Sequence, residues 1–340
     1  MRLAALYRGV ADRYGAGRVL AGGMSLVALG TALVPAATST AMLTFAIGVL
    51  LAVGAGAAGP SILLAAVARL VPVEKRAMAS GIVNAGGSFG QFALVPLAQG
   101  LIGWVGWMAA LWWLSVLMAA SLPLASAPRG KGGGAAGSVR DERLGAALGR
   151  AFGDQNYLLL NAGFFTCGFH VAFIATHLPG VVASCALPAT VGAWSLAVIG
   201  LGNIAGVGWA MGRWRMKSLL ALVYAARAAA VAGFLVAPKT EWTFFVFAAV
   251  LGVTWLSTVP PTAGLVARFY GARYVATLFG VVMLSHQIGG FFGAYLGGRA
   301  FAATQSYDWM WYADIALALA AALVHLPIRE RPLRPVPVAA

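Results

Sequence analysis

The groups best suited to chemistry in this sequence are histidines and amides that lie inside long apolar stretches. His170 and His177 are seven residues apart on one helical face, and His286 begins a stripe of glycines spaced four, three and four residues apart. Histidine changes its charge near neutral pH, so His170 and His286 are candidates for binding a substrate or carrying a proton. Small residues along a helix face indicate close packing, which favours an inward-facing His286.

Further polar residues share helical faces or lie deep in apolar stretches. Asn84 and Gln91 follow helical spacing, with Ser88 between them. Arg227, near the middle of its stretch, would cost about 2.5–3.5 kcal/mol if it faced lipid, so it is either paired within a bundle or extended toward the cytoplasmic surface. The candidate substrate-binding residues are His170, His286, Gln287, Asn203, Asn84, Gln91 and Arg227. The alternative for each is a hydrogen bond between helices, which membrane bundles use widely.

Motifs of enzyme chemistry are lacking or out of context. Residues 86–90 read GGSFG and fit the G-x-S-x-G nucleophile elbow, but that motif needs a strand–turn–helix setting, and here it lies inside an apolar stretch. The sequence has no Walker A loop, no H-E-x-x-H motif and no cysteine–histidine spacing suited to a metal. We therefore expect no enzyme, no ATP-driven pump, no cofactor and no bound metal.

Apolar segments of about 20 residues must position these groups, because each can cross ~30 Å of hydrocarbon as a helix. The chain has 340 residues, 9% of them charged, and a mean hydropathy of +0.85. The ten expected spans are residues 18–37, 41–66, 78–102, 107–127, 156–177, 189–210, 218–237, 242–266, 274–298 and 309–327. The predicted fold class is an all-α polytopic membrane protein, since the strands of a β-barrel would alternate in polarity.

The basic residues indicate the topology. With the N-terminus in the cytoplasm, every Lys and Arg falls on the cytoplasmic side except Lys239, Arg299 and Arg227, as the positive-inside rule predicts. Topology therefore explains the net charge of +14, and we expect no nucleic-acid partner. We expect a multi-pass protein of the cell inner membrane with both termini in the cytoplasm.

A segment rich in glycine and charge, residues 128–155, divides the chain. It predicts an incomplete N-terminal bundle of four spans at 1–127, a cytoplasmic linker at 128–155, a six-helix bundle at 156–327 and a cytoplasmic tail at 328–340. Similar pieces recur about 200 residues apart, with proline-interrupted segments in both halves, and this predicts two bundles in a parallel repeat. Because the second copy of the opening charged turn follows two spans, the repeat also predicts two helices before residue 1.

Asp12, Arg13, Gly15 and Arg18 match the loop signature of the major facilitator superfamily, which this chain resembles. The segments that begin at residues 78 and 276 resemble its bacterial monocarboxylate and oxalate–formate branch. The resemblance implies the major facilitator fold, with ten of twelve helices present, acting as a symporter or antiporter by alternating access. It implies that the substrate is a small organic solute, such as a monocarboxylate or related anion, which is moved together with a proton or by exchange. It also implies that the protein acts as a monomer in the lipid bilayer.

The resemblance also implies a conformational latch formed by the charged loop and its second copy. The latch residues would be Asp12, Arg13 and Arg18, with Arg213 from the second copy, where Gly212 replaces the acid. No acidic residue is expected deep in a span, because Asp314 lies close to an outer end, so a proton-coupling acid would have to lie in the absent helices. A truncated, non-transporting membrane protein or an assembly partner is the alternative function.

Overall fold

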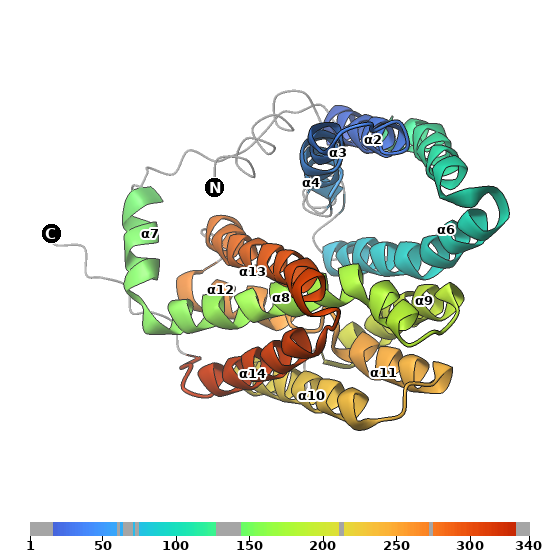
Figure 1. Cartoon of the computed structure of the whole chain (residues 1–340). Helices are drawn as coiled ribbons and strands as arrows, with labels where there is room; N and C mark the ends of the chain where they lie inside the picture. Colours follow the sequence, from blue (N-terminus) through green and yellow to red (C-terminus); the bar gives the residue numbers. More distant parts are fainter. Residues whose placement is uncertain are drawn as a thin grey trace, which may run out of the picture. The chain divides into compact units, whose positions relative to one another are not determined.

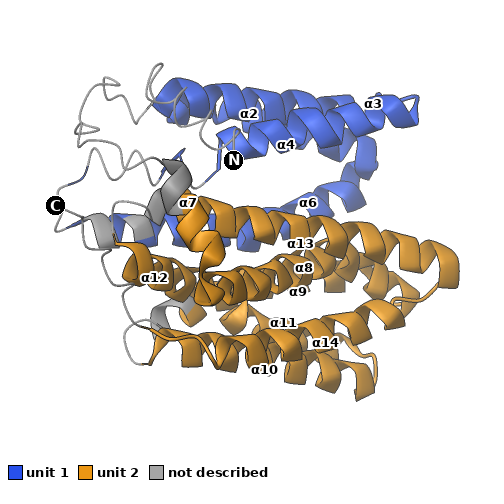
Figure 2. Cartoon of the chain, turned by 90° about the vertical axis from the view of Figure 1, so that its left-hand side faces the viewer, with its two compact units in different colours: residues 1–139 blue, residues 140–340 orange. Residues whose placement is uncertain are grey.

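The computed structural model contains helices and no strand in the part of the chain that it describes. The described residues are 16–59, 62–63, 71, 75–126, 144–210, 214–271 and 275–330. The chain forms two compact units, residues 1–139 and 140–340, which are coloured separately in Figure 2. The boundary falls within the predicted linker 128–155, whose later part contains the helix α7 (Leu144–Gly153). The four-part domain assignment stays a prediction.

Unit 1 is built from three apolar helical segments. Its elements are α2 (Ala16–Leu33), then α3 (Thr40–Phe45), the π-helical η1 (Ala46–Leu51) and α4 (Ala52–Ala57) in one run, then α6 (Arg76–Ala120) and the short 3₁₀ helix η3 (Leu122–Ser126). Gly23 and Gly54 let α2 and α4 meet closely, because a Cβ on Gly23 would lie 2.8 Å from the carbonyl oxygen of Gly54. The later part of α6 is tied to α2 where Ser115 Oγ donates to the Ala28 carbonyl at 2.7 Å.

Unit 2 contains the better-buried helices. In chain order these are α7, α8 (Gln155–Ser184), α9 (Ala189–Ala210), α10 (Met216–Val236), α11 (Glu241–Thr254), α12 (Val259–Tyr270), α13 (Val275–Thr304) and α14 (Asp308–His325). Helix α8 packs against α13, α14 and α9, while α10 lies beside α14 and α9 beside α11 (Figure 1). The hydrophobic core of this unit therefore forms around α8.

Glycines allow the closest helix contacts in unit 2. A Cβ on Gly168 of α8 would collide with the carbonyl oxygen of His286 on α13, and one on Gly293 would collide with the carbonyl of Phe169. Gly202 of α9 faces Gly252 of α11 in the same way, because a Cβ on Gly202 would lie 2.9 Å from the Cα of Gly252. The glycine stripe after His286 thus faces α8, which confirms the close packing predicted from its spacing.

Eight helical segments in the described part of the chain are long and apolar enough to cross a membrane. One of them, Gly81–Ala125, covers most of the two predicted spans 78–102 and 107–127, and its helix α6 turns at Gly106, which has a φ of 79°. The predicted span 309–327 corresponds to α14, which is not among the eight and carries Asp308 and Asp314 in its N-terminal half. The predicted count of ten spans, and the twelve-helix repeat, stay predictions.

Candidate functional site

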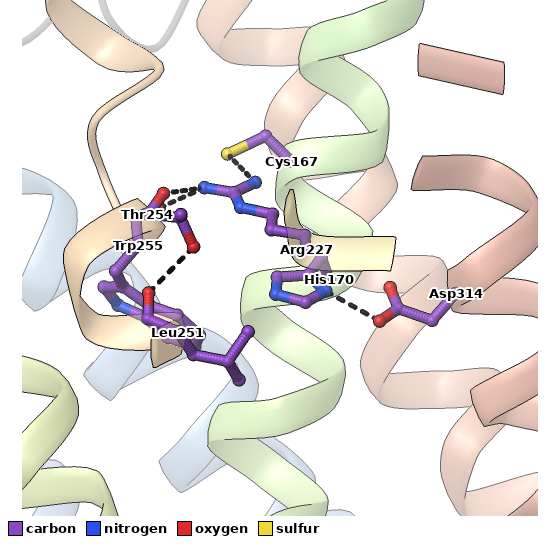
Figure 3. A network of polar contacts seen from close by, with 7 residues as sticks. All are labelled: Cys167, His170, Arg227, Leu251, Thr254, Trp255 and Asp314. Carbon is purple, nitrogen blue, oxygen red and sulfur yellow. Dashed lines mark hydrogen bonds and ion pairs between the residues drawn. The ribbon is translucent and has the colours of Figure 1, made fainter. Parts of the chain in front are cut away.

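The candidate site is a buried polar network in the core of unit 2, which Figure 3 shows from close by. His170 on α8 and Asp314 on α14 form its first part, with Nδ1 of the imidazole 2.7 Å from Oδ2 of the carboxylate. The side chains are 1% and 0% exposed. The remaining polar atom of each group, His170 Nε2 and Asp314 Oδ1, is buried and has no hydrogen-bond partner. Each of these two atoms therefore keeps an unused hydrogen-bonding position inside the protein, which is costly to leave unsatisfied.

The burial of Asp314 was not expected from the sequence, whereas its depth in the membrane stays a prediction. Counting from the expected outer end of its span placed this residue near the membrane surface. In the structure its carboxylate is fully buried against His170. The two residues are 144 positions apart in the chain, so only the tertiary packing of α14 on α8 brings them together. An acid is therefore buried in the core of unit 2.

Arg227 on α10 forms the second part of the network, and its side chain is 0% exposed. Its guanidinium donates to the backbone carbonyls of Thr254 and Trp255, the latter at 2.5 Å, and to Sγ of Cys167 at 3.5 Å. Of the two alternatives that the sequence left open, pairing within the bundle is confirmed and extension toward the cytoplasmic surface is wrong. No carboxylate is among its hydrogen-bond partners, so Arg227 is held by neutral acceptors.

Arg227 binds at a break between two helices. Helix α11 ends at Thr254 and α12 begins at Val259, with Pro260 and Pro261 in its first turn, which is the interruption that the glycine and proline pattern predicted. The last carbonyls of a helix have no partner within it, and they carry the negative end of its dipole. The guanidinium supplies both a donor and a positive charge at this end, so it stabilises the break.

Two more side chains hold the same break from other helices. Asn203 on α9 accepts a hydrogen bond from the backbone N–H of Leu256 at 2.9 Å, through Oδ1. The Oγ1 of Thr258 lies 3.2 Å from Sγ of Cys167 on α8. The ring of Trp255, the first residue of the break, is 6.0 Å from the ring of His170. The break is thus fixed by α8, α9 and α10, and it connects Arg227 with the His170–Asp314 pair.

His286 lies next to this network and interacts with Cys167. It is half-buried on α13, and its ring is 5.1 Å from that of Phe164. Its Nδ1 is buried without a partner. Gln287, the next residue, is exposed, and His177 is bound to the carbonyl of Ala294 at 2.8 Å. The structure therefore brings together His170, Asn203 and Arg227, with His286 near them and Gln287 facing outward.

The other predicted site residues lie in unit 1 or outside the described residues. Asn84 is exposed and Gln91 is half-buried, both on α6, and their positions relative to the network in unit 2 are not defined. Arg18 is exposed on α2. The other three predicted latch residues, Asp12, Arg13 and Arg213, lie outside the described residues. The latch and the substrate-binding set therefore stay predictions.

The sequence reasoning missed a carboxylate that serves the second copy of the charged loop. Glu330 accepts a hydrogen bond from the backbone N–H of Lys217, near the start of α10, at 2.8 Å. It also lies 3.4 Å from Arg268, and Lys217 Nζ donates to the carbonyl of Leu326 at 2.8 Å. The loop lacks its own acid, but the segment after α14 supplies one. Glu330 had been assigned to a tail, and nothing in its sequence context indicates this contact.

A groove of about 450 Å³ lies on unit 2, between α8, α13 and α14. Its polar lining groups are already hydrogen-bonded within the protein: Asn161 to the carbonyl of Tyr157, Thr166 to that of Ala162, and Ser285 to that of Asn161. The remaining lining residues are apolar. This groove therefore offers a solute little beyond apolar contact, and the buried network is the better candidate.

Apolar helices of membrane-spanning length, packed around buried ionisable groups, define this chain as a multi-pass helical membrane protein. Comparison with family models assigns it more closely. Residues 3–294 match the model of the Major Facilitator Superfamily, and the chain belongs to that superfamily. No curated protein gives a significant match to the sequence. Members of this superfamily are membrane transporters of small molecules, which confirms the predicted class, while the predicted branch stays a prediction.

Proposed function

We propose that this chain is a secondary active transporter that moves a small organic anion, such as a monocarboxylate, by alternating access. Transport would be coupled to a proton or to exchange, and the protein would act as a monomer in the inner membrane with both termini in the cytoplasm. The observation that carries the proposal is the broken helix α11–α12, clamped by the fully buried Arg227. In transporters, breaks of this kind expose helix ends that bind ions and charged substrate groups.

The electrostatics of the break favour an anion. The N-terminus of α12 carries the positive end of a helix dipole, and it begins at Val259, directly after the break. Arg227 adds a full positive charge whose hydrogen-bond acceptors are uncharged. Because two of its hydrogen bonds already hold the break, we propose that Arg227 attracts the anion by its charge while Asn203 and His286 supply direct contacts. Gln287, Asn84 and Gln91 complete the proposed substrate-binding set.

Alternating access would then depend on movement at the break and at the loops between helices. The latch proposed for Asp12, Arg13, Arg18 and Arg213 would bias the outward-open state by pairing charges at the cytoplasmic ends. The contact of Glu330 with Lys217 and Arg268 supports a charged clasp on the second bundle as well. Glu330 bonds to Lys217 and Arg268 and not to the groups of the buried network, so substitutions at these three residues are expected to change transport rates rather than substrate selectivity.

The test is uptake of radiolabelled anions into proteoliposomes that contain the full chain. Pyruvate, lactate and oxalate would be compared with a neutral sugar, under an imposed proton gradient and in exchange mode, with protein-free liposomes as the background. We expect saturable uptake of at least one anion, reduced at least tenfold in Asn203→Ala and His286→Gln. The matched control is His177→Gln, because His177 is bound to a backbone carbonyl on α13. Uptake of the sugar alone, or of no solute, would refute the proposal.

A further inference from the structure

We propose that His170 and Asp314 form a single proton-binding site, and that its charge state sets a stoichiometry of one proton to one monovalent anion. This inference rests on the transport function proposed above and identifies the residues that couple it. The pair lies in the core of unit 2, at 1% and 0% exposure, with 2.7 Å between His170 Nδ1 and Asp314 Oδ2. Ionisable groups at such depth mark proton or substrate pathways in membrane proteins.

The geometry assigns the proton-accepting atom. An ionised Asp314 accepts a hydrogen bond from Nδ1–H of a neutral His170, and this fixes the tautomer with a lone pair on Nε2. That Nε2 is buried and has no hydrogen-bond partner. Its lone pair is therefore the position at which the pair can accept one proton, because Nδ1 already donates to the carboxylate. The carboxylate then stabilises the imidazolium that forms.

Charge balance in the core determines what the proton does. Among the described residues of unit 2, Arg227 and Asp314 are the buried side chains that are ordinarily ionised at neutral pH. With His170 neutral, their charges cancel, and the core carries no net charge. One proton on Nε2 raises the net charge to +1. Since net charge in a membrane interior is costly, the protonated state favours entry of one monovalent anion, which restores neutrality.

The transport cycle that follows is balanced in protons and charge. His170 Nε2 forms one N–H bond with a proton from one side, while the Nδ1–H hydrogen bond to Asp314 persists. The anion binds, the bundles change state, and both the anion and the proton leave on the other side. The network returns to the neutral form, so one cycle moves no net charge. The bundles can change state with both the proton and the anion bound, or with neither bound. The form with a bound proton and no anion is disfavoured because its core carries a net charge.

Other titratable groups near His170 do not replace this pair. Helix α8 packs against α7, α9, α12, α13 and α14, and it shares the network with α10. The groups these helices bring toward the network are Asp314, Arg227, His286 and Tyr224, together with Cys167 on α8 itself, and His325 of α14 stacks on Tyr224. The described side chains of α9 include no titratable group. In α7, Arg150 lies one turn from the C-terminus, and α12 carries Arg268 and Tyr270 in its last turn.

The test needs no knowledge of the substrate. The full chain is reconstituted in proteoliposomes on a solid-supported membrane, and the charge displacement after a pH jump is recorded with no solute present. We expect a transient current from the wild type that falls at least tenfold in His170→Gln. The matched control is His177→Gln, a histidine seven residues along the same helix whose hydrogen bond to Ala294 is already made, and its transient should match the wild type.

Asp314→Asn provides a second variant, and we expect the same loss. It leaves Arg227 without a compensating charge, so its folding is checked by size-exclusion chromatography; if it does not fold, His170→Gln decides the question alone. A wild type without a transient, or a His170→Gln variant with an unchanged one, would overturn the proton site. Anion uptake with an unchanged transient in His170→Gln would leave the transport function standing and refute this site. A transient current that depends on His170, without uptake of any anion, would support the proton site and refute the proposed transport function.

Discussion

Replacing Arg227 by methionine gives the sharpest test of the clamp on the broken helix. Methionine keeps most of the side-chain length and the helix propensity, but it removes the charge and every donor. The carbonyls of Thr254 and Trp255 then lose their charged donor, and both residues are buried. An unsatisfied buried acceptor costs about 1–3 kcal/mol, and interhelical hydrogen bonds in membranes average nearer ~0.6 kcal/mol. The variant no longer has to bury a charged guanidinium, and this offsets part of the loss. We therefore expect a net destabilisation of about 2–4 kcal/mol.

The assay uses Cys167, which contacts Arg227 and is fully buried. The chain has two cysteines, so in a Cys185→Ser background the rate of maleimide labelling reports how often the packing around Cys167 opens. A loss of 2–4 kcal/mol corresponds to labelling roughly 30- to 700-fold faster, at 1.4 kcal/mol for each factor of ten. Thermal unfolding of the purified protein in detergent provides an independent measure, and its midpoint should fall.

The matched control for this variant is Arg268→Gln. Arg268 lies in the same unit, is 48% exposed, and makes one ion pair at 3.4 Å with Glu330. Exposed ion pairs contribute about 0–1 kcal/mol, so Cys167 should be labelled less than about fivefold faster than in the unsubstituted background. If Arg227→Met changed the labelling rate no more than this control, Arg227 would not be the clamp, and the break would be held by its other contacts.

Three further substitutions test single contacts in unit 2. Glu330→Ala removes the acceptor for the backbone N–H of Lys217 at the start of α10, and it should lower the stability of that helix end by about 1 kcal/mol. Amide exchange at Lys217 should become faster, and unchanged exchange would contradict the clasp. Gly293→Ala forces a Cβ against a carbonyl of α8 and should cost about 1–3 kcal/mol in thermal stability, whereas Gly233→Ala meets open space and should raise stability by up to ~1 kcal/mol. Equal midpoints for these two would refute the packing argument. Asn203→Ala should speed amide exchange within the break while leaving α14 unchanged, and protection of the break as in the wild type would argue against that contact.

The helices themselves follow from the sequence, because composition and length decide whether a segment can span a membrane. Each predicted span corresponds to a helical segment in the structure, although α6 joins two of them through a turn at Gly106. The break after Thr254 was also predictable, since a glycine at 252 and two prolines at 260–261 weaken a helix there. These are local properties, and local sequence determines them.

The partners of the buried charges were not predictable in the same way. Arg227 satisfies carbonyls on another helix, and Asp314 pairs with a histidine 144 residues earlier in the chain. Both contacts depend on which helix packs beside which and on the depth at which they cross, and hydropathy reports neither. Glu330 shows the same limit, because a carboxylate beyond the last span has no periodic pattern that indicates a cap for α10. Sequence reasoning therefore found the ionisable residues more readily than their roles.

The separate roles of Arg227 and His170 follow from whether each side chain can change its charge. Arg227 is permanently charged, and its contacts anchor backbone carbonyls that cannot move without opening the helix break. His170 has one nitrogen held by Asp314 and one without a partner, so it can change charge while its position stays fixed. A fixed charge beside a switchable one lets a single proton decide whether the core is neutral or positive. That arrangement supports an anion carrier coupled to protons more specifically than family membership alone.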